Sequence, residues 1–295
     1  MSSISVVTGA NSGIGRATAI HLASQGHVVF GTVRSMDKAG KLQAMCAAAG
    51  VEVNLVEMDV ASDESVRNGF AEIMAATGGV VDVLVNNAGI GGNATVEDST
   101  AADHLDVMNV NLCGAVRCQN EVLPGMRERG HGAIVNVTSV VGRLAALAQS
   151  AYVTSKWALE GLSEQLAQEV APFGIRVAII EPGVTKTAIF AKNPDIPSRT
   201  GAYATAYRRM FQMYAAGIAH STDPFEVGKL IHHAVTTDQP QLRYAVSWGA
   251  KELIGGRAAM TDEQWVALNL ADDDNDNEYY DAFQAAFGLD LRDLG

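Results

Sequence analysis

The stretch TGANSGIGRA, Thr8 to Ala17, follows a short apolar run and opens a segment with helical spacing. Gly9, Gly13 and Gly15 give it the spacing G-x3-G-x-G. Glycine permits a tight turn, and because it has no Cβ, backbone N–H groups can approach a pyrophosphate closely. The helix N-terminus adds a favourable field for that anion. A strand before the loop and a helix after it therefore favour a dinucleotide-binding loop over a tight turn without a ligand.

Short β-branched runs alternate with segments of helical spacing along the rest of the chain. The runs are almost continuously apolar, as expected for strands buried on both faces of a parallel sheet. This alternation predicts an α/β fold, a doubly wound parallel sheet of Rossmann type with about seven strands and helices on both faces. The expected strands are 4–7, 27–32, 51–58, 81–87, 133–139, 175–182 and 242–247. The expected helices are 14–24, 37–49, 64–77, 101–128, 151–172 and 224–237.

Two segments stand apart from this alternation. Residues 183–222 are long and irregular, and they follow the sixth strand, at whose carboxyl end such sheets bind ligands. We expect them to form a substrate-covering lid, with a surface subdomain as the alternative. Residues 251–295 read as a helical extension with a capping box at Thr261–Gln264. The expected organisation is one catalytic domain over residues 1–250 with this extension packed on it.

Composition restricts the class of protein. Hydrophobic residues make up 48% and charged residues 18% of the 295, which suits a globular fold. The net charge of -12 and the lack of a basic patch disfavour nucleic acid and anionic membranes as partners. No signal-peptide pattern or membrane-length apolar run is visible, and Cys46, Cys113 and Cys118 are expected to be buried thiols. We therefore expect a soluble cytoplasmic protein.

The sequence predicts no metal site. His232 and His233 are adjacent and point in different directions on a helix, and no H-x3-H or HExxH pattern occurs. Acidic residues alternate over 272–278 as in a calcium loop, but the required glycine and glutamate are missing. We expect a solvated acidic turn there.

The second expected strand ends in GTVRS, without an acidic residue. A carboxylate at this place would bind the 2′-hydroxyl of NAD, whereas an arginine would accept the 2′-phosphate of NADP. Arg34 offers a planar fork of donors suited to a phosphate, although an exposed loop arginine is the alternative. Asp37 is expected to cap the next helix instead. The sequence therefore favours NADP(H) over NAD(H).

Seven motifs, in order, resemble those of the short-chain dehydrogenase/reductase family in its common subgroup. They are TGANSGIG, DV, NNAG, NVNLCG, SVVG, YVTSK and EPGVTKT, and the match runs over residues 5–247. The GTVR stretch and the long tail are similar to members that act on steroids and other bulky carbonyls. The resemblance implies cofactor contacts at Gly9, Asn11, Ser12, Gly13, Ile14, Gly15, Arg34, Asp59, Val60, Asn87, Ala88, Gly89, Tyr152, Lys156, Pro182, Gly183, Thr185 and Thr187.

The same resemblance assigns an acid–base pair to YVTSK. Reduction of a ketone needs a hydride on carbon, which the cofactor supplies, and a proton on oxygen. A phenol is a weak acid at neutral pH, but a nearby ammonium lowers its pKa. Lys156 is one helical turn from Tyr152, close enough to have this effect. Tyr152 is thus the expected general acid in reduction and general base in oxidation.

Two further residues complete the expected catalytic set. Ser139 ends the fifth expected strand and, by resemblance, holds the substrate oxygen beside the phenol. Asn111 resembles the family asparagine that holds a water in a proton relay with the lysine. Asn109 competes for that role, but the pattern N-x-x-G ends at Gly114 and selects Asn111.

The expected function is an NADP(H)-dependent oxidoreductase that interconverts a ketone and a secondary alcohol, on an apolar or bulky substrate. A catalytically silent NADP(H)-binding regulator or scaffold is the alternative. The resemblance also implies that the long helices 101–128 and 151–172 pair copies into a homodimer or homotetramer. The residues expected to line an apolar pocket are Val140, Val141, Leu144, Leu147, Phe190, Tyr203 and Phe211.

Overall fold

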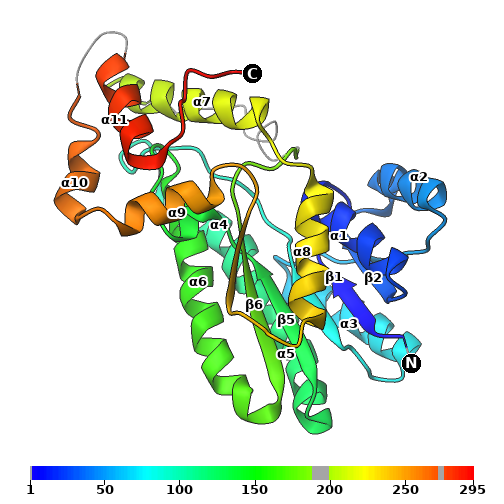
Figure 1. The fold of residues 1–295 in the computed structure, drawn as a ribbon. Helices are drawn as coiled ribbons and strands as arrows, with labels where there is room; N and C mark the ends of the chain where they lie inside the picture. The colour runs from blue at the N-terminus through cyan, green and yellow to red at the C-terminus, as the bar shows by residue number, and fades with distance from the viewer. Residues whose placement is uncertain (1, 188–198, 272–275) are drawn as a thin grey trace.

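The computed structural model describes residues 2–187, 199–271 and 276–295, drawn in Figure 1. Seven parallel strands form one sheet in the order β3-β2-β1-β4-β5-β6-β7. The order reverses between β1 and β4, where sheets of this kind bind ligands. The predicted doubly wound fold is therefore confirmed. The strands are β1 (Ile4–Val7), β2 (Val28–Val33), β3 (Asn54–Glu57), β4 (Val83–Asn86), β5 (Gly132–Val137), β6 (Ile175–Pro182) and β7 (Arg243–Val246).

Helices cover both faces of the sheet and form a core with each. On one face, Ile20 and Ile231 pack with the side chains of the strands, and on the other, Phe70 and Met126 do so. The covering helices are α1 (Gly13–Ser24), α2 (Gly40–Ala49) and α8 (Pro224–Thr236) on the first face, and α3 (Asp63–Thr77), α5 (Gly114–Arg129) and α6 (Ser150–Val170) on the second.

The structure corrects several predicted boundaries. The strand expected over 51–58 is shorter, because β3 is an edge strand paired only over Asn54–Glu57 with β2. The helix expected over 101–128 is divided into α4 (Ala101–Met108), a π-helical turn at Asn109–Cys113 and α5. The predicted cap at Asp37 is wrong. Asp37 lies in a 3-10 turn, η1 (Met36–Lys38), and Ala39 precedes α2.

The segment 183–222 is also more regular than expected. It contains α7 (Ala204–Ala219). The buried side of this helix includes Tyr207, Met210 and Ala216. Residues 188–198, which include Phe190, lie outside the described part of the chain. The extension beyond residue 250 is helical, as predicted, with α9 (Ala250–Ala258), α10 (Asp262–Ala267) and α11 (Asn277–Phe287). The predicted capping box at Thr261 and Gln264 is present.

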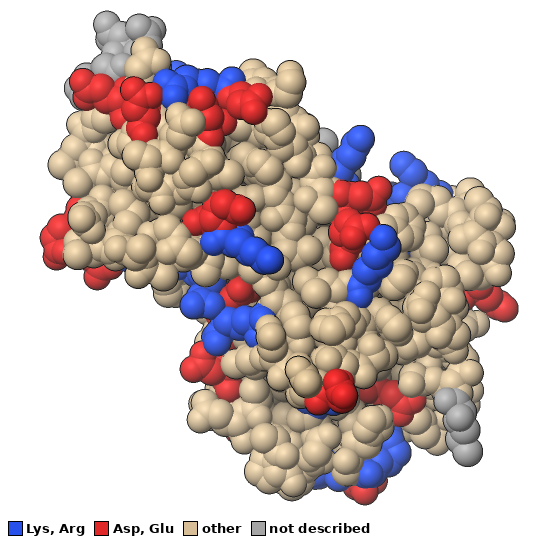
Figure 2. All heavy atoms as spheres, in the orientation of Figure 1, with Lys and Arg blue, Asp and Glu red and all other residues tan. Residues whose placement is uncertain are grey.

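The surface carries charges of both signs. Acidic and basic side chains lie next to each other on the face shown in Figure 2. Of the three thiols, Cys46 and Cys118 are buried as expected, but Cys113 is only half-buried. Within the described residues, no helix has both the length and the apolarity to cross a membrane.

A buried ion pair joins α7 to the C-terminal helices, which gather with it at one end of the sheet (Figure 1). The Asp276 side chain is 0% exposed and accepts hydrogen bonds from Arg208 and from Arg209 Nε, the latter at 2.8 Å. Arg209 also donates to the Ala271 carbonyl at 2.5 Å and lies over the Tyr279 ring at 4.3 Å. The expected solvated turn is therefore wrong at Asp276, and residues 272–275 lie outside the described chain.

Removing the charge of Asp276 tests the role of its ion pairs with Arg208 and Arg209. Burial alone would raise the pKa of Asp276, but the hydrogen bonds and charges of Arg208 and Arg209 outweigh it and lower the pKa. The ionised form therefore stabilises the fold at neutral pH, and this contribution is lost as the pH falls through the lowered pKa. We expect Asp276→Asn to lower the free energy of unfolding in urea by about 3–5 kcal/mol at pH 7, because a buried guanidinium loses its partner. The difference from the wild type should shrink in acid.

Asp262→Asn is the matched control. The Asp262 side chain pairs with Arg257 but is 86% exposed. This variant should change stability by at most about 1 kcal/mol. Equal losses of unfolding free energy in Asp276→Asn and Asp262→Asn would contradict the stabilising role of the buried ion pair.

Candidate active site

A cavity of about 990 Å³ runs along the carboxyl edge of the sheet, from the glycine loop to the C-terminal helices. All the site residues expected from the sequence line it except Gly15 and Asn111. The lining residues among them are Gly9, Asn11, Ser12, Gly13, Ile14, Arg34, Asp59, Val60, Asn87, Ala88, Gly89, Ser139, Tyr152, Lys156, Pro182, Gly183, Thr185 and Thr187.

The glycine loop needs its glycines for two different reasons. Gly9 and Gly13 have φ of +67° and +54°, a left-handed conformation that side chains with a Cβ rarely adopt. Gly15 lies behind the cavity, where a Cβ would be 2.3 Å from Asn87 Nδ2 and 2.5 Å from Gly9 O. Gly15 therefore shapes the loop without facing a ligand.

The loop offers groups that fit a dinucleotide. It leads into the N-terminus of α1, whose N-cap Ser12 makes no side-chain capping bond. Asn11 Oδ1 is buried and has no hydrogen-bond partner among the described residues. Since a buried acceptor without a partner is costly, a ligand hydroxyl at this place would satisfy it.

A cationic end of the cavity lies beyond β2. Arg34 lines it together with Ser35 and Lys38, two residues that the sequence reasoning did not single out. Within the described residues, neither Arg34 nor Lys38 forms an ion pair, and the nearby Glu57 carboxylate accepts instead from Met36 N at 3.1 Å. The 3-10 turn η1 brings Lys38 to the same end of the cavity. The sequence signal for Lys38 was its position four residues after Arg34.

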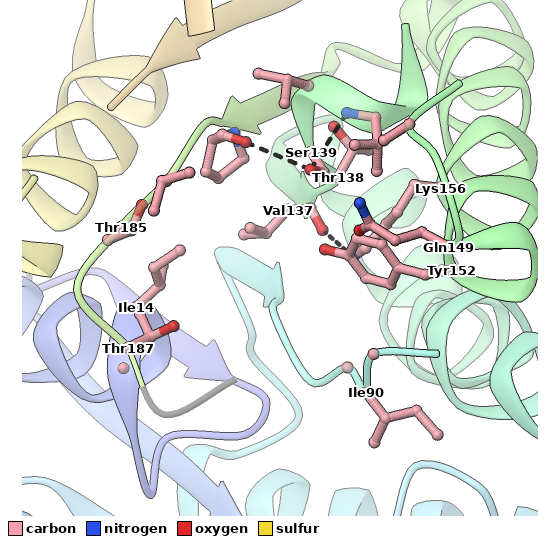
Figure 3. A pocket seen from close by; sticks show the side chains of 18 of the residues that line it. Ile14, Ile90, Val137, Thr138, Ser139, Gln149, Tyr152, Lys156, Thr185 and Thr187 are labelled. Carbon is pink, nitrogen blue, oxygen red and sulfur yellow. Dashed lines mark hydrogen bonds between the residues drawn. The ribbon is translucent and has the colours of Figure 1, made fainter. Parts of the chain in front are cut away.

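The centre of the cavity holds the expected acid–base residues. Figure 3 shows Tyr152 and Lys156 on one wall, facing Ile14 and Thr185 on the other. Lys156 Nζ donates to the Val137 carbonyl at 2.9 Å and lies 5.6 Å from the centroid of the Tyr152 ring.

Ser139 lies beside the phenol and is held in place by backbone groups. Its hydroxyl accepts from Val141 N at 3.3 Å and donates weakly to the Pro182 carbonyl at 3.4 Å. The short 3-10 turn η3 (Val140–Gly142) that follows Ser139 therefore fixes the hydroxyl at the rim of the sheet.

Burial dominates the acid–base properties of this centre. It raises the pKa of the Tyr152 phenol, and a hydrogen bond with Ser139 acts in the opposite direction. It lowers the pKa of Lys156 to about 8, while the Glu160 carboxylate raises it. The net direction at Tyr152 is therefore upward, and the ammonium of Lys156 is directed to the Val137 carbonyl, so the lowering of the Tyr152 pKa by Lys156 stays a prediction.

Asn111 lies behind the cavity wall, in the π-helical turn. Its Oδ1 accepts from Ile90 N at 2.8 Å, and its Nδ2 donates to Ile90 O and Ser155 Oγ, both at 2.9 Å. The side chain thus ties the lining residue Ile90 to α6. The competing Asn109 faces elsewhere and donates to Ala61 O at 3.2 Å.

The remaining part of the cavity is mostly apolar. Four of the residues expected there line it, namely Val140, Val141, Leu144 and Leu147. Tyr203 and Phe211 were also expected, but neither is among its lining residues, and Tyr203 precedes α7 as its N-cap. The Tyr203 hydroxyl donates to Glu97, and Phe211 is 44% exposed.

The sequence reasoning missed the other half of this apolar wall. It comes from one side of α7 and from the C-terminal helices. On α7, the available signal was the spacing of three and four residues from Met210 to Met213 and Tyr214. For the C-terminal helices, nothing in the sequence indicated which elements they would face. The missed residues are Met210, Met213, Tyr214, Leu253, Trp265, Leu268, Tyr279 and Phe283.

Comparisons with known proteins agree with this geometry. The model of the family described as short chain dehydrogenase matches residues 3–196. Estradiol 17-beta-dehydrogenase 1 of Rattus norvegicus is 35% identical over 254 residues, which cover 82% of this chain and 73% of that protein. A relative that acts on a steroid was expected from the GTVR stretch and the tail.

Two solved structures extend the comparison. A short-chain dehydrogenase from Streptomyces avermitilis has a TM-score of 0.79 and 35% identity, with 92% of this chain and 98% of that chain covered. The actinorhodin polyketide ketoreductase with NADPH has a TM-score of 0.70 and 31% identity, with 79% and 90% covered. The family match, the fold and the motifs agree, and the chain belongs to the short-chain dehydrogenase family of oxidoreductases.

Proposed function

We propose that the protein is an NADP(H)-dependent oxidoreductase that interconverts a ketone and a secondary alcohol. The observation that carries this proposal is the cavity itself, which the glycine loop, Ser139, Tyr152 and Lys156 line together. A nicotinamide cofactor, when bound, supplies the hydride in reduction and accepts it in oxidation. The chain must then supply the proton and hold the substrate oxygen.

The residues of the chain divide this work. Tyr152 gives its phenolic proton to the carbonyl oxygen in reduction and takes a proton from the alcohol in oxidation. The Ser139 hydroxyl donates a hydrogen bond to the same oxygen. Lys156 contributes a positive charge beside the phenol and a donor for the cofactor ribose. Asn111 holds the Ile90 segment and, by family resemblance, contributes to a proton relay with Lys156.

Arg34 and Lys38 support the choice of NADP(H) over NAD(H). Both are cations at the end of the cavity beyond β2, where the 2′-phosphate would lie. No carboxylate follows β2 directly, since the strand ends at Val33 and the next residues are Arg34 and Ser35. The related ketoreductase solved with NADPH is consistent with this choice.

The apolar wall supports a bulky carbonyl substrate. Trp265, Phe283 and Met213 line the cavity on the side of the C-terminal helices, and such surfaces favour flat or long apolar molecules. In this proposal, residues 1–250 form the catalytic domain, 183–222 cover the substrate and 251–295 complete the wall. A cytoplasmic homodimer or homotetramer is part of the same proposal.

Substitution of Tyr152 tests the chemistry. Tyr152→Phe removes only the hydroxyl, so we expect turnover of a ketone to fall by at least about 100-fold while NADPH still binds. NADPH consumption measures the first and fluorescence titration the second. Tyr203→Phe, the same change at a residue outside the cavity lining, should leave turnover unchanged. Retained activity in Tyr152→Phe would rule out this mechanism.

Substitution of Arg34 tests the cofactor preference. Arg34→Ala removes a charged hydrogen-bonding group, so we expect the ratio of kcat/KM with NADPH to that with NADH to fall about 10- to 100-fold. Arg67→Ala, which removes an exposed arginine of α3, is the control and should not change the ratio. A wild-type enzyme that prefers NADH in parallel assays would contradict the proposal.

A further inference from the structure

A second ionisable residue lies one helical turn beyond Lys156 on α6. Lys156 and Glu160 are only 5% and 4% exposed. Residues four apart on a helix are neighbours on one face. Glu160 Oε2 accepts from Arg243 Nε at 3.0 Å, whereas Glu160 Oε1 is buried without a hydrogen-bond partner among the described residues. Glu160 therefore brings a buried carboxylate with unused accepting capacity to the back of the catalytic lysine.

The turn after Ser139 leaves room for this carboxylate. A Cβ at Gly142 would be 2.9 Å from Glu160 Cγ and 3.2 Å from Lys156 O. The absence of a side chain at Gly142 thus lets the Glu160 side chain pass behind the turn that holds Ser139. The Glu160 side chain therefore lies next to the turn that holds Ser139 and next to the helical turn that begins at Lys156.

Apart from Lys156, the most deeply buried charges around Glu160 are negative. Glu181 on β6 is also a buried carboxylate, and it pairs with Arg143 at 3.0 Å. Arg243 on β7 binds both Glu160 and the exposed Glu164, the latter at 2.6 Å. The side chains of Arg143 and Arg243 are more exposed than those of Glu160 and Glu181. Because solvent screens the arginines more effectively, the cluster presents a negative field to its interior.

We propose that Glu160 is a positioning residue that keeps Lys156 in its ammonium form within the cavity. A buried amine favours its neutral state, and a neutral amine would lose both the charge beside Tyr152 and one N–H donor. Arg243 in turn favours the ionised form of Glu160.

The electrostatic directions agree with this role. Burial lowers the pKa of Lys156 to about 8, and Glu160 raises it. Burial also raises the pKa of Glu160, and Glu181 adds to this rise, whereas Thr138 and Arg243 act against it. Removal of the Glu160 charge should therefore let Lys156 lose its proton at a lower pH.

Glu160→Gln tests the proposal through Lys156 itself. The protonation of Lys156 is followed by NMR of protein labelled with ¹³C at the lysine Cε, and the signal missing in Lys156→Met identifies it. We expect the midpoint to move to lower pH by about one unit, a tenfold change in the acid dissociation constant. The alkaline limb of the pH profile of kcat/KM should also move to lower pH. At pH values below that limb, activity should stay close to that of the wild type.

Glu164→Gln is the matched control, since Glu164 is on the same helix and binds the same arginine but is exposed. It should leave the midpoint of Lys156 within about 0.3 units, because solvent screens its charge. An unchanged midpoint in folded Glu160→Gln, or an equal shift in Glu164→Gln, would overturn the proposal. If Glu160→Gln does not fold, Glu160→Asp withdraws the carboxylate by one methylene and should give a smaller shift in the same direction. No shift in that variant would also overturn the proposal.

The catalytic consequence rests on the proposed function, but the lysine titration does not. A protein that binds no NADPH and reduces no ketone would refute the proposed function. The midpoint of Lys156 in the two glutamine variants would still decide the role of Glu160.

Discussion

The Thr8 hydroxyl joins the ends of β1 and β4 at the point where the strand order reverses. It accepts from Asn87 N and Ala88 N, both at 3.0 Å, and donates to Val85 O at 3.3 Å. A Cβ at Gly9 would lie 2.9 Å from Ala88 Cα, so the two loops are in close contact. This buried link fixes the glycine loop against the NNAG turn, and the cavity lies along the edge that they form.

The acid–base centre and the apolar wall depend on different parts of the chain. The centre is built on β5 and α6, where burial shifts the pKa of Tyr152 and Lys156 and where Glu160 acts from behind. The wall belongs to α7 and the C-terminal helices, which the buried pair of Arg209 and Asp276 holds together. The proposed chemistry thus depends on β5 and α6, whereas the shape of the apolar part of the cavity depends on an ion pair outside the sheet.

Much of this arrangement could be predicted from the sequence, because it depends on local patterns. Apolar periodicity predicted all seven strands, and the glycine spacing together with the resemblance in short motifs indicated the loop residues that line the cavity. The failures concern contacts between distant segments. Nothing near Asp276 in the sequence indicates its pairing with Arg209, and the π-helical turn that contains Asn111, behind the cavity wall, has no signal in spacing. The direction of the pKa shift at Tyr152 was missed because burial is a tertiary property.

The most direct test of the central claim is the fate of the transferred hydride. The protein is incubated with NADPH carrying deuterium at both C4 positions of the nicotinamide and with a panel of bulky ketones, and the products are examined by mass spectrometry. The account predicts a secondary alcohol with deuterium on its carbinol carbon, formed in equal amount to the NADPH consumed. Tight binding of NADPH without any labelled alcohol across the panel would contradict it and would favour a catalytically silent NADP(H)-binding protein.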